Sequence, residues 1–317
     1  MKIALLEPLS VPQSTIDALA APLKAAGHEF VSYPTKTTNP AELLVRSQGA
    51  DIVMIANTPY PASVIGACPQ LKLIAVAFTG VDLVDLDAVR TRGITLCNCA
   101  GYSDTSVAEL AVGLAIDVMR RVVEADTATR DGGTAAGFLG REIAGKTVGI
   151  LGTGHIGCAT AKLFGAFGAQ VLGYARHENP EALEAGVTYA SLEELLAKSD
   201  ILSLHLPLTN ETRGFMNAER LAAMKPGAVL INCARGPIVD NQALVEALKS
   251  GHLAGAGIDV YDVEPPLPAD NPLLKAPHTT LTPHMAYFTR EAMERRARIE
   301  FANVEAWLAG KPQNVVS

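Results

Sequence analysis

Three predicted strand ends in the C-terminal half of the sequence carry side chains that could perform acid–base chemistry on a small anion. Arg235 follows the apolar run Ala228–Asn232, Glu264 lies in the segment GIDVYDVEPP, and His284 closes the segment LTPH. An arginine presents a planar fork of donors suited to a carboxylate, and histidine titrates near neutral pH. Each residue also has an ordinary alternative: Arg235 as a surface residue, Glu264 as a loop acid and His284 as a helix cap.

A glycine-rich turn precedes these residues in the chain. The strand predicted over Thr147–Leu151 runs into the sequence GTGHIG (152–157), and a helix pattern, CATAKLFGAFG, follows. In such a turn Gly152 permits the tight bend, Gly154 lets the backbone approach a pyrophosphate, and Gly157 lets the helix pack closely on the strand. The helix start then offers unpaired N–H groups to the phosphates. The position between strand and helix favours a dinucleotide-binding turn over an ordinary glycine-rich turn.

The end of the next predicted strand, Gln170–Tyr174, bears on the type of dinucleotide. An acid is expected there to bind the ribose hydroxyls, but Ala175 and Arg176 follow instead. Without an acid at this position, and with the Arg176 guanidinium next to it, a negatively charged 2′-phosphate is favoured. The sequence therefore predicts NADP(H) as the preferred cofactor. The alternative is that Arg176 is a solvated loop residue and that NAD(H) is used.

Strands that alternate with helices place these motifs in an α/β fold with parallel sheets. The first series spans about 100 residues, a typical domain size, and the second begins at Lys146. Long helices are predicted over Ser103–Arg121 and Thr289–Leu308, the latter rich in Arg and Glu. Besides the strands named above, we predict strands at Lys2–Glu7, Glu29–Tyr33, Ile52–Ala56, Leu73–Ala77, Ile94–Cys97, Ile201–Leu206, Gly255–Val260 and Thr279–Leu281.

Composition excludes several classes of protein. The 317 residues are 49% hydrophobic and 19% charged, which is enough apolar surface for a sizeable core. The net charge of −7, without a basic block, argues against nucleic acid or an anionic membrane as partner. No apolar run of about 18 residues and no signal peptide is found, so we expect a soluble, cytoplasmic protein. The five cysteines lack C-x-x-C spacing and form no cluster with histidines, so we expect reduced thiols and no metal site.

Taken together, the motifs resemble the D-2-hydroxyacid dehydrogenase family over nearly the whole chain. The resemblance rests on TVGILGTGHIG, on HLPLT at 205–209, on NCARG at 232–236 and on GIDVYDVEPP, and continues through TPHMAYFT at 282–289. In the first part of the chain, AFTGVDLVDL (77–86) and GITLCNCAGYSDTSVAE (93–109) match the family's substrate loop and the start of its long helix.

The resemblance implies two Rossmann/flavodoxin-like parallel-sheet domains with an active-site cleft between them. Residues 1–100 and 285–317 would form the substrate domain, and residues 101–284 the NAD(P)-binding Rossmann domain. It also implies a homodimer formed through the cofactor domain. The activity implied is interconversion of a small 2-oxo acid and a D-2-hydroxy acid.

The resemblance also assigns roles to residues. Arg235, Glu264 and His284 would be catalytic: His284 protonates the carbonyl oxygen, Glu264 orients His284 and favours its imidazolium form, and Arg235 binds substrate. Backbone N–H groups of Phe78, Thr79, Gly80 and Val81 would bind substrate as well. Asp259 matches the residue beside the nicotinamide carboxamide, with a structural acid as the alternative. The full set implied for the cofactor is Gly152, Thr153, Gly154, His155, Ile156, Gly157, Ala175, Arg176, His205, Leu206, Pro207, Thr212, Cys233, Ala234, Arg235, Asp259, His284 and Ala286.

The substrate is left open among glyoxylate, hydroxypyruvate, pyruvate and bulkier 2-oxo acids. Relatives that act on phosphorylated acids commonly carry an arginine near Asn57–Tyr60, and none stands there. Two other functions remain as alternatives, a cofactor-sensing binding protein and phosphite oxidation, whereas Glu264 counts against formate oxidation. The aromatic candidates for a pocket rim, which could equally be core, are Tyr60, Phe78, Tyr102, Tyr287 and Phe288.

Overall fold

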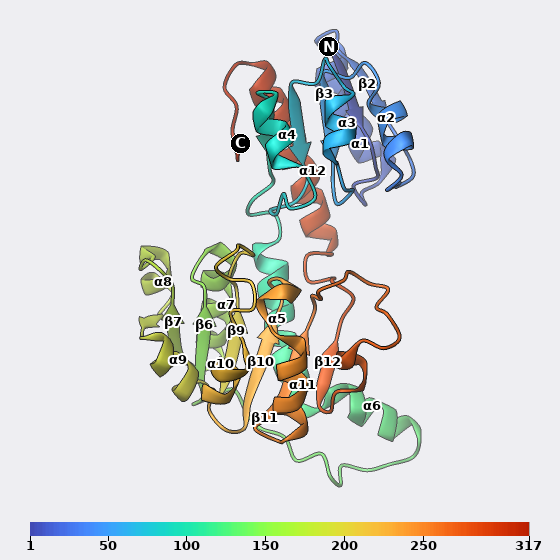
Figure 1. The fold of residues 1–317 in the computed structure, drawn as a ribbon. Coiled ribbons are helices and arrows are strands. Elements are labelled where there is room, and N and C mark those ends of the chain that lie inside the picture. The colour runs from blue at the N-terminus through green and yellow to red at the C-terminus, as the bar shows by residue number, and fades with distance from the viewer. Residues whose placement is uncertain (317) are drawn as a thin grey trace. The chain divides into compact units, whose positions relative to one another are not determined.

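The chain folds into two α/β units, each with its own parallel sheet (Figure 1). The computed structural model describes residues 1–316. Unit 1 comprises Met1–Ser103 together with the chain from Phe288 onward, and unit 2 comprises Asp104–Tyr287. The α/β class with two parallel-sheet domains, expected from the sequence, is confirmed.

The sheet of unit 1 has the strand order β2-β1-β3-β4-β5, with every pairing parallel. The central strands β3 and β4 are continuous apolar runs, IVMI and LIAV, and all their residues are buried, as expected for strands covered on both faces. The strands are β1 Lys2–Leu5, β2 Glu29–Ser32, β3 Ile52–Ile55, β4 Leu73–Val76 and β5 Thr95–Cys97, and the helices are α1 Gln13–Ala25, α2 Pro40–Ser47, α3 Ala62–Gly66, α4 Leu86–Thr91 and α12 Arg290–Leu308.

The C-terminal part of the chain completes unit 1. Helix α12 packs against α1 and β4. The indole N–H of Trp307 donates to Thr95 Oγ1 over 3.1 Å. Beyond the helix, Val315 pairs with Cys97, and the Val316 N–H donates to the Leu96 carbonyl over 2.8 Å. The free edge of β5 is therefore covered by the end of the chain.

The sheet of unit 2 has the order β12-β11-β10-β9-β6-β7-β8 and is also parallel. Strand β6 lies between β7 and β9, so the chain first builds outward on one side and then on the other. Ligands of such sheets bind at the carboxyl ends of the strands beside this switch point. The strands are β6 Thr147–Leu151, β7 Gln170–Tyr174, β8 Thr188–Tyr189, β9 Ile201–Leu204, β10 Ala228–Asn232, β11 Leu253–Ile258 and β12 Thr279–Leu281.

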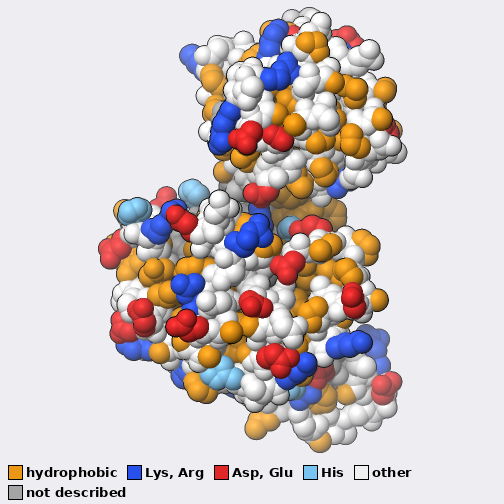
Figure 2. Space-filling view, in the orientation of Figure 1, with side chains coloured by type: hydrophobic (Ala, Val, Ile, Leu, Met, Phe, Trp, Pro, Cys, Tyr) orange, Lys and Arg blue, Asp and Glu red, His pale blue; other side chains and the backbone are white. Residues whose placement is uncertain are grey.

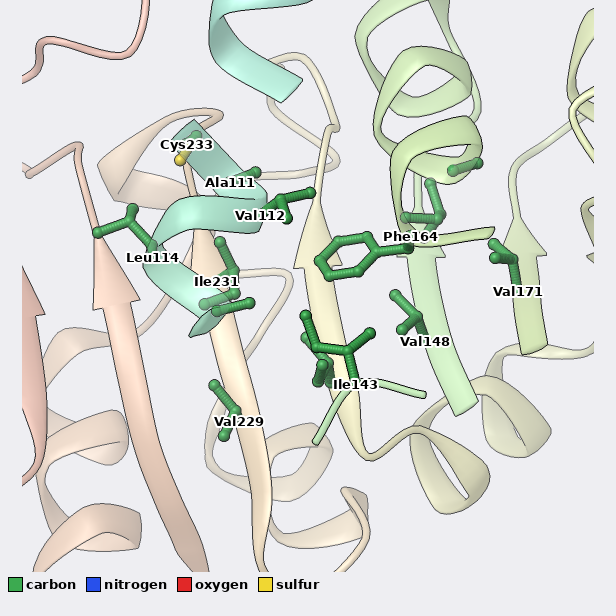
Figure 3. Packing of buried hydrophobic residues seen from close by; sticks show 14 of the residues in the cluster. Ala111, Val112, Leu114, Ile143, Val148, Phe164, Val171, Val229, Ile231 and Cys233 are labelled. Carbon is green, nitrogen blue, oxygen red and sulfur yellow. The ribbon is translucent and has the colours of Figure 1, made fainter. Parts of the chain in front are cut away.

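Helices α5 and α7 cover the face of this sheet shown in Figure 3. Ala111 and Leu114 of α5, Phe164 of α7 and Ile231 of β10 belong to one buried cluster. A Cβ at Gly257 of β11 would lie 2.8 Å from Leu114 Cβ, so glycine permits the close approach of α5. The helices of this unit are α5 Asp104–Arg120, α6 Val122–Arg130, α7 His155–Ala166, α8 Pro180–Glu184, α9 Leu192–Lys198, α10 Ala218–Ala223 and α11 Asn241–Lys249, with 3₁₀ turns at Gly236–Ile238 and Pro272–Lys275.

Several elements differ from the prediction. Strand β11 begins and ends two residues earlier than predicted, so Asp259 is the first residue after the strand. Strand β8 has only two residues, and α6 buries none of its residues, so neither produces a clear hydrophobic pattern. No helix within residues 1–316 is long and apolar enough to cross a membrane. On the face that Figure 2 shows, basic and acidic side chains are interspersed.

Candidate active site

The glycine turn joins β6 to α7 through backbone contacts that only glycine allows. Gly152 has φ +101°, and a Cβ there would lie 2.7 Å from the His205 carbonyl oxygen. A Cβ at Gly157 would lie 2.1 Å from the Gly152 carbonyl oxygen. The first turn of α7 is therefore packed directly on the end of the strand.

The same turn leaves room where a pyrophosphate would bind. A Cβ at Gly154 would meet no atom within 4 Å, and no side chain caps the N-terminus of α7. The first N–H groups of a helix have no partner within the helix and carry partial positive charge. An uncapped start beside an open glycine therefore fits the phosphates of a dinucleotide.

Two residues that were not predicted brace this turn. The hydroxyl of Tyr189 lies 2.6 Å from Thr153 Oγ1 and accepts the Asn179 N–H over 2.7 Å. The Asn179 amide donates to the Thr153 carbonyl over 2.8 Å. These contacts come from β8 and the start of α8, at sequence positions without any recognised motif.

The loop after β7 holds the charged residues relevant to the ribose. Arg176 Nη1 lies 3.5 Å from Glu211 Oε2, and each side chain is 78% exposed. Glu211 belongs to the loop that follows β9, which is closed by a 2.6 Å hydrogen bond from Thr212 Oγ1 to the Pro207 carbonyl. The side chain of Ala175 supplies no acceptor for a ribose hydroxyl. The guanidinium of Arg176 is thus available to an anion but already has one carboxylate nearby.

His205, at the start of that loop, is held as a neutral side chain. Its backbone N–H donates to the Leu151 carbonyl over 2.8 Å, and its Nε2 lies 2.9 Å from Ser203 Oγ. Burial lowers the pKa of His205 to about 4. His205 therefore contributes shape and hydrogen bonding near neutral pH rather than charge.

Glu264 and His284 form a hydrogen-bonded pair. His284 Nδ1 lies 2.7 Å from Glu264 Oε2. His284 Nε2 has no protein partner among residues 1–316, and the ring packs edge-on against Tyr287 with 5.6 Å between centroids. The backbone of His284 has φ +54°, in the left-handed region that is uncommon for residues other than glycine. One ring nitrogen is therefore fixed by a carboxylate while the other remains available to a ligand.

Asp259 holds the segment that carries His284. Its carboxylate is fully buried and accepts from Thr282 Oγ1 over 2.6 Å, from the Met285 N–H over 2.8 Å and from the Ala286 N–H over 2.9 Å. Burial raises the pKa of Asp259, and the three hydrogen bonds oppose that rise. Both carboxylate oxygens are thus engaged by the chain itself, on either side of His284.

Arg235 lies in a turn that is fixed by its neighbours. Its Nη1 donates to the Ala234 carbonyl over 2.8 Å, and the Asn232 amide donates to the Arg235 carbonyl over 3.0 Å. A Cβ at Gly236 would lie 2.0 Å from the Tyr261 carbonyl carbon, so glycine is required there.

Tyr261 connects the turn of Arg235 to the segment of His284. Besides packing against Gly236, it donates its hydroxyl to the Thr282 carbonyl over 2.9 Å. Burial raises its pKa to about 12, so the hydroxyl stays protonated. Because β10, β11 and β12 are adjacent strands, Arg235, Glu264 and His284 all follow carboxyl ends on the same edge of the sheet. Tyr261 was not among the predicted site residues.

In unit 1, the loop after β4 presents unpaired backbone donors. The Cys99 N–H donates to the Phe78 carbonyl over 2.9 Å, and the Asn98 amide donates to the Thr79 carbonyl over 2.7 Å. Within residues 1–316, the N–H groups of Thr79, Gly80 and Val81 donate to no acceptor. Consecutive N–H groups without an acceptor could donate hydrogen bonds to an anion.

Of the aromatic candidates, Tyr60 is a core residue. Its side chain is fully buried, and its hydroxyl donates to Ser47 Oγ over 2.9 Å. The Lys36 ammonium donates to Asn57 Oδ1 over 2.7 Å in the nearby exposed loops.

Comparison with known proteins agrees with the resemblance seen in the motifs. Residues 112–286 match the family model "D-isomer specific 2-hydroxyacid dehydrogenase, NAD binding domain". A hydroxypyruvate reductase of Blautia hydrogenotrophica is 36% identical over 100% of both chains, and a glycerate dehydrogenase of Methylorubrum extorquens is 41% identical over 91% of this chain and 92% of its own. The solved structure of an acyclic imino acid reductase (Bsp5) in complex with NADPH and D-Arg is 32% identical, covers 100% of both chains and has a TM-score of 0.89. The chain belongs to the D-isomer specific 2-hydroxyacid dehydrogenase family.

Proposed function

We propose that the protein reduces a small 2-oxo acid, of the glyoxylate or hydroxypyruvate type, to the D-2-hydroxy acid with NAD(P)H. The observation that carries this proposal is the 2.7 Å pair of Glu264 and His284, which leaves His284 Nε2 open at the same edge of the sheet as Arg235. The names of the two relatives, a hydroxypyruvate reductase and a glycerate dehydrogenase, support the same substrate class.

In the proposed reaction, His284 acts as the general acid. A bound nicotinamide cofactor supplies the hydride to C2 of the substrate. His284 Nε2 gives its proton to the carbonyl oxygen, so that one hydride and one proton convert the ketone into the alcohol. Glu264 keeps the ring oriented through Nδ1 and stabilises its positive charge before transfer. Arg235 binds the substrate's oxygen atoms with its planar fork.

The loop at 78–81 is proposed to bind the substrate carboxylate. Its three free N–H groups can each donate a hydrogen bond to a carboxylate oxygen, and such charge-assisted bonds are about twice as strong as neutral ones. Among substitutions, only proline removes a backbone N–H group, so Val81→Pro would delete one of these donors.

The experiment that tests the function is a substrate panel with wild-type and His284→Ala protein. Wild-type protein should turn over glyoxylate or hydroxypyruvate, and His284→Ala should lower kcat by about 10²- to 10⁴-fold, the usual contribution of general acid catalysis. Binding of NADPH, followed by fluorescence, should be unchanged, and His28→Ala serves as the matched control. Near-normal turnover by His284→Ala would remove His284 from this role. Cofactor binding by the wild type without turnover of any 2-oxo acid would favour the cofactor-sensing alternative.

We propose that NADPH is preferred over NADH, on the ground of Arg176 and the absence of an acid at Ala175. Because Glu211 lies beside Arg176, the 2′-phosphate has to compete with this carboxylate, so the preference should be moderate. Arg176→Gln should lower kcat/KM for NADPH and leave that for NADH unchanged. A higher kcat/KM with NADH than with NADPH in the wild type would contradict the proposal.

We also propose a homodimer formed through α6 and the loop that follows it. Helix α6 has no buried residue, and the exposed fractions of Val122, Val123 and Leu139 are 50%, 61% and 99%. A second copy of the chain would cover these apolar side chains. Light scattering should show a dimer for the wild type and a monomer for Val123→Glu/Leu139→Glu. A monomeric wild type would contradict the proposed homodimer.

A further inference from the structure

A charged side chain lies buried directly beneath the loop at 78–81. Arg296 of α12 is only 3% exposed, and its guanidinium carbon lies 5.2 Å from the centroid of the Phe78 ring. Its Nη2 donates to the Leu9 carbonyl over 3.0 Å. Arg296 thus connects the loop that follows β1 to Phe78 in the loop that follows β4.

The surroundings of Arg296 do not neutralise its charge. Its Nε is buried without a hydrogen-bond partner, and so are both carboxylate oxygens of Glu300, one helical turn further on. Glu300 is fully buried, which raises its pKa well above the usual value and favours its uncharged form. Of the nearby Glu7 carboxylate, Oε1 accepts hydrogen bonds from the N–H groups of Ala56 and Thr58.

This arrangement costs free energy. Burying polar groups without hydrogen-bond partners is unfavourable. The attraction between the guanidinium and the Phe78 ring offsets only part of that cost. A costly buried charge at a loop that offers three free N–H groups therefore points to a role in function rather than in stability.

The contacts form a closed chain that fixes the loop. The Phe78 ring packs on Arg296, and the Phe78 carbonyl accepts from the Cys99 N–H over 2.9 Å. Cys99 Sγ lies 3.6 Å from the Arg296 carbonyl oxygen. On its other edge the Phe78 ring meets Tyr102, 5.8 Å away between centroids, and the Tyr102 carbonyl accepts from Arg295 Nε over 2.9 Å. Adjacent arginines of α12 therefore hold both aromatic residues of this cluster.

We propose that Arg296 is a positioning residue for substrate binding: it holds Phe78 in place and supplies a buried positive charge behind the N–H groups of Thr79, Gly80 and Val81. The proposal rests on the proposed function, in which this loop binds the carboxylate of a 2-oxo acid. Arg296 acts through Phe78 and through its electrostatic field and does not itself contact the substrate.

The test compares two substitutions at Arg296, one at Phe78 and a control substitution at Arg298. Arg296→Met retains the length of the side chain without the charge and should raise KM for the 2-oxo acid, and Ki for oxamate, at least about tenfold, while KM for NADPH stays unchanged. Arg296→Lys, which keeps the charge, should recover much of the loss. Phe78→Leu, which removes the ring, should raise KM in the same direction. Arg298→Met, on the exposed side of α12, is the matched control and should behave as wild type.

Folding is monitored separately from function. Trp307 is the only tryptophan of the sequence and lies on α12, so its fluorescence in urea reports whether unit 1 is folded. If folded Arg296→Met keeps the wild-type KM and Ki, the proposal is wrong even though the enzyme is active. If Arg296→Met does not fold, an unchanged KM in Phe78→Leu contradicts it and a raised KM supports it. Absence of turnover in the wild type would instead overturn the proposed function.

Discussion

Substitution of Asp259 by asparagine tests how the chain holds His284, the proposed general acid. The carboxylate of Asp259 accepts three hydrogen bonds, from Thr282, Met285 and Ala286, and these donors lie on either side of His284. Asparagine keeps the size of the side chain but replaces one acceptor oxygen by an NH₂ group. If the remaining oxygen still accepts hydrogen bonds from Thr282 Oγ1 and the Met285 N–H, the new NH₂ group faces the Ala286 N–H. Two donors then point at each other without an acceptor between them.

The expected loss follows from these contacts. A hydrogen bond to a charged group contributes about 1.5 to 3 kcal/mol, and a buried N–H left unpaired costs about 1 to 3 kcal/mol more. The conformation that presents His284 is thus destabilised by about 2.5 to 6 kcal/mol. At about 1.36 kcal/mol per factor of ten, kcat should fall by about 10²- to 10⁴-fold. Thr282→Val removes a single bond of this set and should cost about tenfold.

Steady-state kinetics at saturating cofactor, together with thermal unfolding, measures this effect. The control is Asp262→Asn, an exposed acid of the next turn whose carboxylate accepts from Asn241. A kcat within threefold of wild type would refute the argument that Asp259 positions His284. A raised KM for the cofactor with normal kcat would assign Asp259 to cofactor contact instead.

Three further predictions concern the glycine turn and the buried acid of α12. Gly154→Ala should fold normally, because its Cβ enters open space, but it should weaken cofactor binding. Gly157→Ala places a Cβ against backbone atoms and should lower the free energy of unfolding by about 1 to 3 kcal/mol. Calorimetry of the two variants measures this difference in stability. Tyr189→Phe removes the hydroxyl that binds Thr153 and Asn179 and should raise the KM for the cofactor several-fold. Because burial raises the pKa of Glu300 in the folded state, the wild type should lose stability relative to Glu300→Gln as the pH rises above ~4.5, where an unfolded glutamate ionises. Arg296, Glu7 and Cys99 are the titratable groups that face Glu300 and are present in both proteins, so parallel urea-unfolding curves at pH 5, 6.5 and 8 would contradict this assignment.

The predicted bounds of four strands, β6, β7, β10 and β12, agree with the structure. Strands β6 and β10 are buried almost throughout, as expected for apolar parallel strands covered by helices. Burial does not explain the agreement for β12, whose residues TTL are all only partly buried. Helix α6 was missed because its sequence, VVEADTATR, has no face that packs against the sheet. Strand β8 was missed because two residues at a sheet edge give no periodicity.

The site was predictable where chemistry restricts the residue type. Glycines forced by backbone contact, and an acid and a histidine at strand ends, are visible in the sequence. Residues that act through others are not: Tyr261 and Tyr189 hold the site with single hydroxyls. The helix that contains Arg296 is rich in Arg and Glu, and nothing in that pattern distinguishes its buried arginine and glutamate from the solvated ones. Their burial depends on which face of α12 packs against the sheet of unit 1.

The division of unit 1 between the two ends of the chain has a consequence for biosynthesis. Helix α12 and residues Asn314–Val316 cover β4 and the edge of β5, yet the ribosome makes them after the whole of unit 2. Residues 1–103 therefore leave the ribosome with one apolar surface uncovered. This surface stays exposed while 184 further residues, from Asp104 to Tyr287, are synthesised. At about 5 to 20 residues per second this delay is on the order of ten seconds or more. Unit 2, which is continuous, can fold during that interval, so the nascent N-terminal segment is the part of this protein that most needs protection by chaperones.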